Sequence, residues 1–128
     1  MSYYFNKTIH SSFEEAIERA TEALKKEGFG VLTEIRIHDK LKEKLDVDFH
    51  RYTILGACNP AFAYKALQAE NKIGTMLPCN VIVQELGSGK IEIAAVNPVE
   101  SMKAIENTAL GNVALQVTEM LKRVIEGL

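Results

Sequence analysis

Two cysteines, each followed by an asparagine, are the residues whose types and positions most favour chemistry in this chain. Cys58-Asn59 and Cys79-Asn80 contain its only cysteines. Thiols bind soft or borderline metals such as zinc or Cu(I), form redox pairs, or act as nucleophiles. Cys58 directly precedes Asn59-Pro60, a combination typical of a helix start, and the dipole at a helix N-terminus favours the thiolate.

Whether the two thiols meet depends on one strand pairing. The sequence predicts strands over residues 52–58 and 79–86, and if these are adjacent and antiparallel, the end of one abuts the start of the other. The predicted ligand-binding residues at that end are Cys58, Asn59, Cys79, Asn80, Glu34 and Glu70, with the Met76 thioether as a further donor. For a metal ion, the predicted ligands are Cys58 and Cys79, and zinc is the cofactor considered.

Each of these residues also has a plainer interpretation. Cysteine is often a small buried hydrophobic residue, and strong zinc motifs use C-x-x-C pairs instead of two separated cysteines. Asparagines cap helices and form turns. Glu34 and Glu70 have basic residues nearby in the sequence, which favours solvated ion pairs.

A second group of potential metal ligands lies between two predicted strands. The alternative metal set is His38, Asp48 and His50, with Asp39 nearby. Two imidazoles with carboxylates suit zinc or another divalent ion, although such residues at strand ends are commonly solvated polar groups. Eight strand residues at about 3.3 Å each place His50 roughly 26 Å from Cys58, so one site cannot use both groups.

Recognisable catalytic motifs are absent from the sequence. It contains no Ser-His-Asp order, P-loop, G-x-G-x-x-G or H-E-x-x-H. The catalytic residues of an enzyme with this sequence are therefore unknown, and the sequence does not decide whether the protein is an enzyme.

Composition excludes several classes of partner. The 128 residues carry a formal net charge of -2, and 25% of them are charged, without a basic run that would neutralise a row of phosphates. We therefore expect no nucleic-acid partner. No apolar run approaches the roughly 20 residues of a membrane span, and the N-terminus lacks the apolar core of a signal peptide, so we expect a cytoplasmic protein without a membrane partner.

The elements that must position the cysteines follow from hydrophobic periodicity. Ser12 and Glu15 form a capping box before a helix that Gly28 ends, and residues 108–125 repeat apolar positions at helical spacing. Strands are predicted at residues 3–8, 30–38, 52–58, 79–86 and 90–96, with short helices at 40–45, 60–70 and 98–105. This order predicts one α+β domain over residues 1–128, with a mostly antiparallel sheet and two long amphipathic helices packed on it.

Several segments resemble the domain-of-unknown-function 302 family. They are GFGVLTEI at 28–35, LKEKL at 41–45, YTILGACNP at 52–60, YKALQAE at 64–70 and GTMLPCNV at 74–81. The resemblance covers nearly the whole chain, and LGACNP and LPCNV are its most specific parts. It implies a β-α-β(4)-α fold similar to the halves of TATA-binding protein, a bacterial or archaeal source and a homodimer, and it implies no established activity. Likeness in fold to a DNA-binding protein carries no functional weight in this acidic chain.

Three functions remain open at this point. The first is a homodimeric binding domain whose small ligand or metal ion lies at the Cys58 and Cys79 end of the sheet. The second is a thiol-dependent enzyme with redox or hydrolytic chemistry, and the third is a purely structural homodimeric interaction module.

Overall fold

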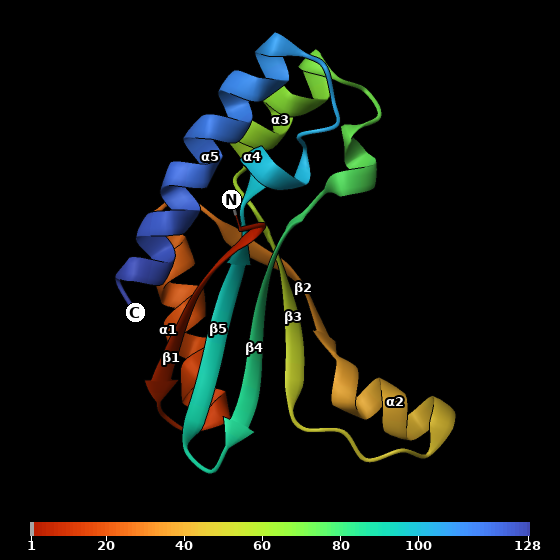
Figure 1. Cartoon of the computed structure of the whole chain (residues 1–128), viewed down its shortest axis with the longest axis vertical. Coiled ribbons are helices and arrows are strands. Elements are labelled where there is room, and N and C mark those ends of the chain that lie inside the picture. The colour runs from red at the N-terminus through yellow and green to blue at the C-terminus, as the bar shows by residue number, and fades with distance from the viewer. Residues whose placement is uncertain (1) are drawn as a thin grey trace.

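The structure, a computed structural model, describes residues 2–128 and is built on one five-stranded sheet (Figure 1). In chain order the elements are β1 (Tyr4–His10), α1 (Phe13–Lys26), β2 (Gly30–Arg36), α2 (Ile37–Leu45), β3 (Tyr52–Cys58), α3 (Pro60–Ala69), the 3₁₀ helix η1 (Ile73–Met76), β4 (Cys79–Gly87), β5 (Lys90–Val96), α4 (Pro98–Ser101) and α5 (Thr108–Glu126). The strand order is β1-β5-β4-β3-β2, and every neighbouring pair is antiparallel. The predicted α+β class is confirmed. No helix of the described residues is long and apolar enough to cross a membrane.

The strand pairing on which the cysteine site depends is present. In the register between β3 and β4, Ala57 lies opposite Cys79 and Gly56 lies opposite Asn80. Alternation along each strand then directs Leu55, Ala57 and Cys79 to one face of the sheet, where they are buried. The residues between these positions point to the other face.

Both long helices, α1 and α5, lie on the same face of the sheet (Figure 1). Their apolar stripes and the inward residues of the three central strands form the main core, which includes Leu24, Val83, Ile93 and Leu121. Within residues 2–128, no long helix covers the other face. We call that uncovered side, carried by β1 to β5, the bare face.

The ends of α1 follow the local rules read from the sequence. Ser12 accepts a hydrogen bond from the Glu15 backbone N–H at 3.1 Å, as expected for an N-cap. Gly28 has a φ of 84°, and the Phe29 N–H bonds to the Leu24 carbonyl. That combination is the predicted Schellman ending, which only glycine adopts without strain.

The predicted strand 30–38 is two residues too long. β2 ends at Arg36, and α2 begins at Ile37, so the predicted start of the short helix at residue 40 is three residues too late. Asp39 lies in the first turn of α2, where the helix dipole favours a carboxylate and where Arg36 pairs with it at 2.8 Å. A register shift between Val31 and Thr33 places those two residues on opposite faces, which a simple alternation does not anticipate.

Of the two helices predicted near the C-terminus, one is shorter in the structure and the other is confirmed. The helix expected to run to about Ile105 ends at Ser101. The helix predicted over residues 108–125 is confirmed as α5, which begins at Thr108 although Gly111 weakens its first turn. The Asn107 side chain caps it by accepting from the Leu110 N–H at 3.1 Å, which offsets the cost of the glycine.

Helix α2 projects from the sheet beside β3, at the end opposite α3 and α4 (Figure 1). None of its residues is buried, and Leu45, Val47 and Phe49 in and after it expose 66%, 43% and 45% of their surfaces. We call residues 37–49 the arm.

Gly56 is a position where two neighbouring segments approach the backbone closely. A Cβ atom there would lie 2.8 Å from Pro78 Cγ and closer still to Thr33 Oγ1. The small residue that the sequence places near the end of β3 is therefore needed to let β2 and the start of β4 pack on both sides of it.

We expect Gly56→Ala to lower the free energy of unfolding by about 1–3 kcal/mol, because the proline ring cannot move aside without shifting the strand. Urea unfolding measures the change. The matched control is Gly111→Ala, where a Cβ meets nothing within 4 Å. That substitution should stabilise the helix by up to about 1 kcal/mol. Equal stability of the Gly56→Ala variant and wild type would contradict the close approach.

Candidate functional site

An apolar cavity of about 360 Å³ lies where β3 ends and β4 begins. Its walls are α3, the N-terminal half of α5, and the segment that leads from η1 into β4 (Figure 1). The lining residues are Phe29, Leu32, Ala57, Cys58, Asn59, Phe62, Ala63, Ala66, Leu67, Gly74, Leu77, Pro78, Cys79, Pro98, Met102, Leu110, Val113, Ala114 and Val117. None of them carries a formal charge at neutral pH.

The cavity separates two hydrophobic clusters. The main core lies between the sheet and the helices α1 and α5. A smaller cluster, built around Ala66, Ile73 and Leu110, lies beyond the end of the sheet, between α3, η1 and the start of α5. Alanine occupies several facing positions, including Ala63 and Ala114, and such short side chains leave the space between the clusters unfilled.

Both cysteines line this cavity, as free thiols. Cys79 is buried and points to the helix-covered face, whereas Cys58 is half-buried at the end of β3. Burial raises the pKa of the Cys79 thiol to about 11, and the nearby Cys58 thiol adds to that shift. Cys79 is therefore a neutral thiol at physiological pH, which disfavours it as a nucleophile or metal ligand.

Asn59 also lines the cavity, but its polar atoms serve the fold. Its Oδ1 accepts the Phe62 N–H at 3.5 Å and so caps α3. Its Nδ2 donates to the Glu27 carbonyl at 3.3 Å, which ties the start of α3 to the end of α1. The asparagine thus helps to hold the cavity wall in place.

The other predicted ligand-binding residues lie outside the cavity lining. Asn80 is exposed on the bare face, opposite Gly56. Glu34 is exposed on the edge strand β2, and Glu70 follows α3 as its C-terminal cap residue. Met76 is 43% exposed at the end of η1. The structure therefore brings together Cys58, Asn59 and Cys79 but not the two glutamates or Asn80.

For a metal ion, the donors at this end are few. Among residues 2–128, no group of three or more His, Cys, Asp or Glu side chains is arranged to hold one. A structural zinc ion takes four ligands, and Cys58 and Cys79 supply only two. Cys79 lies opposite Ala57, and successive strand residues point to opposite faces, so the Cys58 and Cys79 side chains leave the sheet in different directions. The donor set does not fit zinc without ligands from elsewhere.

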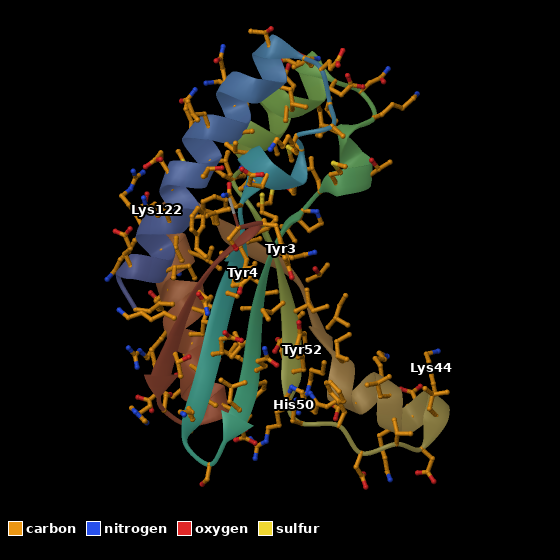
Figure 2. The ribbon with its side chains drawn as sticks, in the orientation of Figure 1. Tyr3, Tyr4, Lys44, His50, Tyr52 and Lys122 are labelled. Carbon is orange, nitrogen blue, oxygen red and sulfur yellow. The ribbon has the colours of Figure 1, made fainter. Side chains whose placement is uncertain are left out.

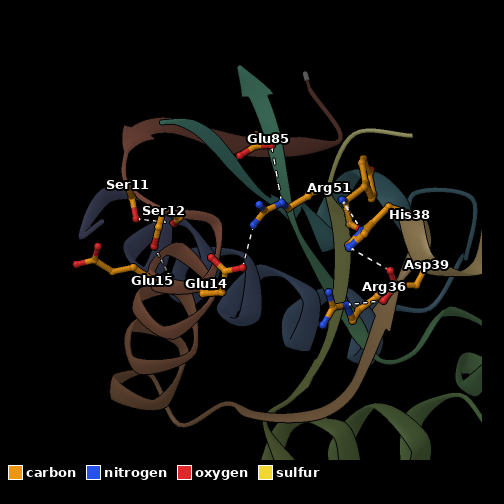
Figure 3. Close-up of polar contacts among 10 residues, drawn as sticks. Ser11, Ser12, Glu14, Glu15, Arg36, His38, Asp39, Arg51 and Glu85 are labelled. Atoms are coloured by element: carbon orange, nitrogen blue, oxygen red, sulfur yellow. Dashed lines mark hydrogen bonds and ion pairs between the residues drawn. The ribbon is translucent and has the colours of Figure 1, made fainter. Parts of the chain in front are cut away.

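The alternative metal set lies at the opposite end of the sheet, with His38 and Asp48 in the arm and His50 directly after it; Figure 3 shows His38, and Figure 2 shows His50. His38 Nδ1 accepts the Tyr52 N–H at 2.9 Å, so this nitrogen is occupied in the fold. Asp48 lies 3.3 Å from Lys42 Nζ, and His50 Nε2 bonds to Gln84 Oε1 at 2.9 Å. Each member of the set therefore has its own partner.

Arg51 forms two ion pairs at this end of the sheet (Figure 3). The Arg51 guanidinium lies 2.8 Å from Glu14 on α1 and 3.9 Å from Glu85 on β4. These exposed pairs contribute little each. The polar residues around His38 thus connect the arm and α1 to the sheet.

Most cavity residues were not predicted from the sequence. They are ordinary core types such as Phe62, Leu77 and Val113, and nothing in their identity separates a cavity wall from a filled core. The available signal was the alanine content of α3, with Ala61, Ala63, Ala66 and Ala69 in ten residues. Two of these alanines, Ala63 and Ala66, line the cavity, and their short side chains fill little of the space beside the helix.

The raised pKa of Cys79 predicts an alkaline loss of stability. An unfolded chain ionises this thiol near pH 9, whereas the folded protein keeps it neutral to about pH 11. Between these values the unfolded state releases a proton that the folded state retains, so the free energy of unfolding falls as pH rises. We expect a loss of about 2 kcal/mol by pH 11.

The measurement is urea unfolding of wild type and Cys79→Ala across this pH range. The substitution lowers stability at every pH but should remove the part of the alkaline slope that belongs to the thiol. Cys58→Ala is the matched control. Parallel curves for wild type and Cys79→Ala would show that the thiol does not titrate in this way.

No curated protein matches the chain. Among solved structures, an uncharacterised conserved DUF302 protein from Bacillus stearothermophilus superimposes with a TM-score of 0.89 at 30% sequence identity, covering 98% of each chain. The family described as "Domain of unknown function DUF302" matches residues 5–128. The chain belongs to the DUF302 family, as its LGACNP and LPCNV segments suggested.

Proposed function

We propose that this protein binds a small, uncharged apolar molecule in the cavity between α3 and α5. The single observation that supports this most is an apolar cavity of about 360 Å³ without a charged residue in its lining. Cavities of roughly 300–1,000 Å³ are typical of small-molecule sites. The walls of this cavity offer few hydrogen bonds to water.

The nature of the lining favours an apolar ligand over a metal ion. Burying a charge without a partner is costly, and this cavity provides neither a counter-ion nor a set of ligands. The thiols of Cys58 and Cys79 and the edge of the Asn59 amide are its polar features. They suit the orientation of a neutral ligand by weak contacts.

The enzyme alternative has less support. A thiol-dependent enzyme requires a thiolate, and burial favours the neutral form of Cys79. Both cysteines are free, so we infer a cytoplasmic location, where thiols stay reduced.

We also propose that the protein is a homodimer that forms through its bare face. In the sheet register, Ile35 lies opposite Ile54, Ile54 opposite Ile82, and Ile82 opposite Ala94. These four residues form an apolar row that crosses four strands on the uncovered side. A second copy would cover this row and give the exposed apolar residues of the arm something to pack against.

Binding in the cavity is tested with the neutral fluorescent probe N-phenyl-1-naphthylamine. We expect its emission to rise on saturable binding to wild type, and Ala63→Met to weaken binding by at least about tenfold because the longer side chain occupies the cavity. The matched control is Ala61→Met. Ala61 lies on the same helix, is exposed and does not line the cavity, so binding should be unchanged.

Two results would count against an apolar-ligand site. One is the absence of saturable binding, and the other is equal loss in both variants. Solvent extraction and elemental analysis of freshly purified protein complete the test. Stoichiometric zinc that disappears in Cys58→Ser and Cys79→Ser would support the metal-binding alternative instead.

The dimer is tested by sedimentation equilibrium. We expect a mass twice that of the 14.2 kDa chain, and a shift to monomer in Ile35→Lys, since an ammonium group in the apolar row opposes packing. Leu115→Lys is the control, because Leu115 is 58% exposed on α5, away from the bare face. A monomeric wild type, or a dimer insensitive to Ile35→Lys, would remove the proposed interface.

A further inference from the structure

A second hollow, of about 400 Å³, lies on the bare face, away from the cavity between α3 and α5. The β4–β5 register explains its floor, because Ile82 lies opposite the much smaller Ala94. One step along the same strands, Gln84 lies opposite Glu92 and closes one end of the hollow. The floor is therefore apolar, and one wall carries a carboxylate.

Glu92 is held in place by neutral groups. Its Oε1 accepts from Gln84 Nε2 at 2.7 Å, and its Oε2 accepts from Asn6 Nδ2 at 2.9 Å. His50 bonds to the other end of the Gln84 amide and so fixes which way that amide points. Amides orient the carboxylate without neutralising it. In the part of the chain that the structure describes, no Lys, Arg or His forms an ion pair with Glu92, which is half-buried.

Three of the four tyrosines of the chain line the same hollow. Tyr3 and Tyr4 lie over the upper part of the sheet in Figure 2, with their ring centroids 5.0 Å apart in an edge-on arrangement, and Tyr52 lies lower on β3. Tyr52 and Tyr3 line the hollow together with Glu92. Burial raises the pKa of the Tyr52 phenol, and the charges of Glu92 and Tyr3 raise it further.

From this geometry we propose that the hollow binds an organic ammonium group. Aromatic faces attract cations through the ring quadrupole, and alkylated ammonium ions are the ligands that aromatic cages recognise. Glu92 supplies the opposite charge, and the floor of Ile82 and Ala94 accommodates the alkyl carbons. The site differs from the cavity between α3 and α5 in position and charge, so either proposal can fail without the other.

The probe is choline, and its reference is the uncharged isostere in which a tert-butyl group replaces the trimethylammonium group. The chain has no tryptophan, so tyrosine fluorescence reports binding directly, and Tyr64→Phe removes the one tyrosine outside the hollow. In that background we expect saturable binding of choline, and binding of the isostere weaker by about tenfold or more.

Glu92→Gln removes the charge and keeps the size of the side chain. We expect it to weaken choline binding about five- to tenfold and to leave binding of the isostere unchanged. The control is Glu34→Gln, since Glu34 is an exposed carboxylate that does not line the hollow. Circular dichroism checks that each variant is folded, and a repeat in the Ile35→Lys background prevents an interface from masking the site.

The proposal is overturned if choline does not bind, if the isostere binds equally well, or if Glu92→Gln has no effect on choline. Sedimentation with excess tetramethylammonium identifies the source of the natural ammonium group. Dissociation of a dimer would assign it to a lysine side chain of a second copy, whereas an unchanged mass would assign it to a free small molecule. The choline titrations decide whether the hollow binds ammonium, and the sedimentation result decides only the source of the group.

Discussion

The structure depends on one constraint, which is that two long helices cover only one face of a five-stranded sheet. Helices α1 and α5 bury the inward residues of β3, β4 and β5, and this packing makes the main core. Nothing comparable covers the other face in the described chain. Alternation along each strand then sends every second residue toward that bare face, so its isoleucines and tyrosines follow directly from the same packing.

The cavity has a different physical origin. Helix α5 is displaced along the sheet toward α3, so its N-terminal half continues past the strand ends and packs against α3 (Figure 1). This contact forms a second hydrophobic cluster that the sheet cannot reach. Alanines line the space between the clusters, and a packed interior with small side chains on facing surfaces leaves a void. The two cysteines border that void because the paired strands begin and end there.

The cavity between α3 and α5 and the hollow on the bare face disfavour different kinds of ligand. The cavity between α3 and α5 lacks charge and therefore disfavours ions, whereas the hollow on the bare face contains a carboxylate without a cationic partner among the described residues. A single ligand chemistry does not suit both. The likeness to a solved DUF302 protein at a TM-score of 0.89 shows the arrangement of the chain, and the chemistry of each hollow depends on its own side chains.

The sequence by itself determined the elements, because caps, periodicity and turn residues act over a few positions. Ser12, Gly28 and Asn59 end or begin helices through local hydrogen bonds, and the structure retains all three. The sequence also placed Cys58 and Cys79 at one end of the sheet, on condition of a single strand pairing. The alternation of residues 30–38 predicted the wrong end for β2, because a register shift and the Arg36–Asp39 pair interrupt the strand pattern.

Only the tertiary structure decided where space remains. A void depends on whether facing side chains from distant segments meet, and Ala63 and Ala114 lie 51 positions apart in the sequence. The hollow on the bare face likewise joins Tyr4, Tyr52 and Glu92 from three different strands. For the same reason, the thiols of Cys58 and Cys79, which the sequence marks as candidates for chemistry, are part of the apolar wall of the cavity between α3 and α5. Residue types indicate possible chemistry, but burial and the neighbours supplied by the fold determine which chemistry is available.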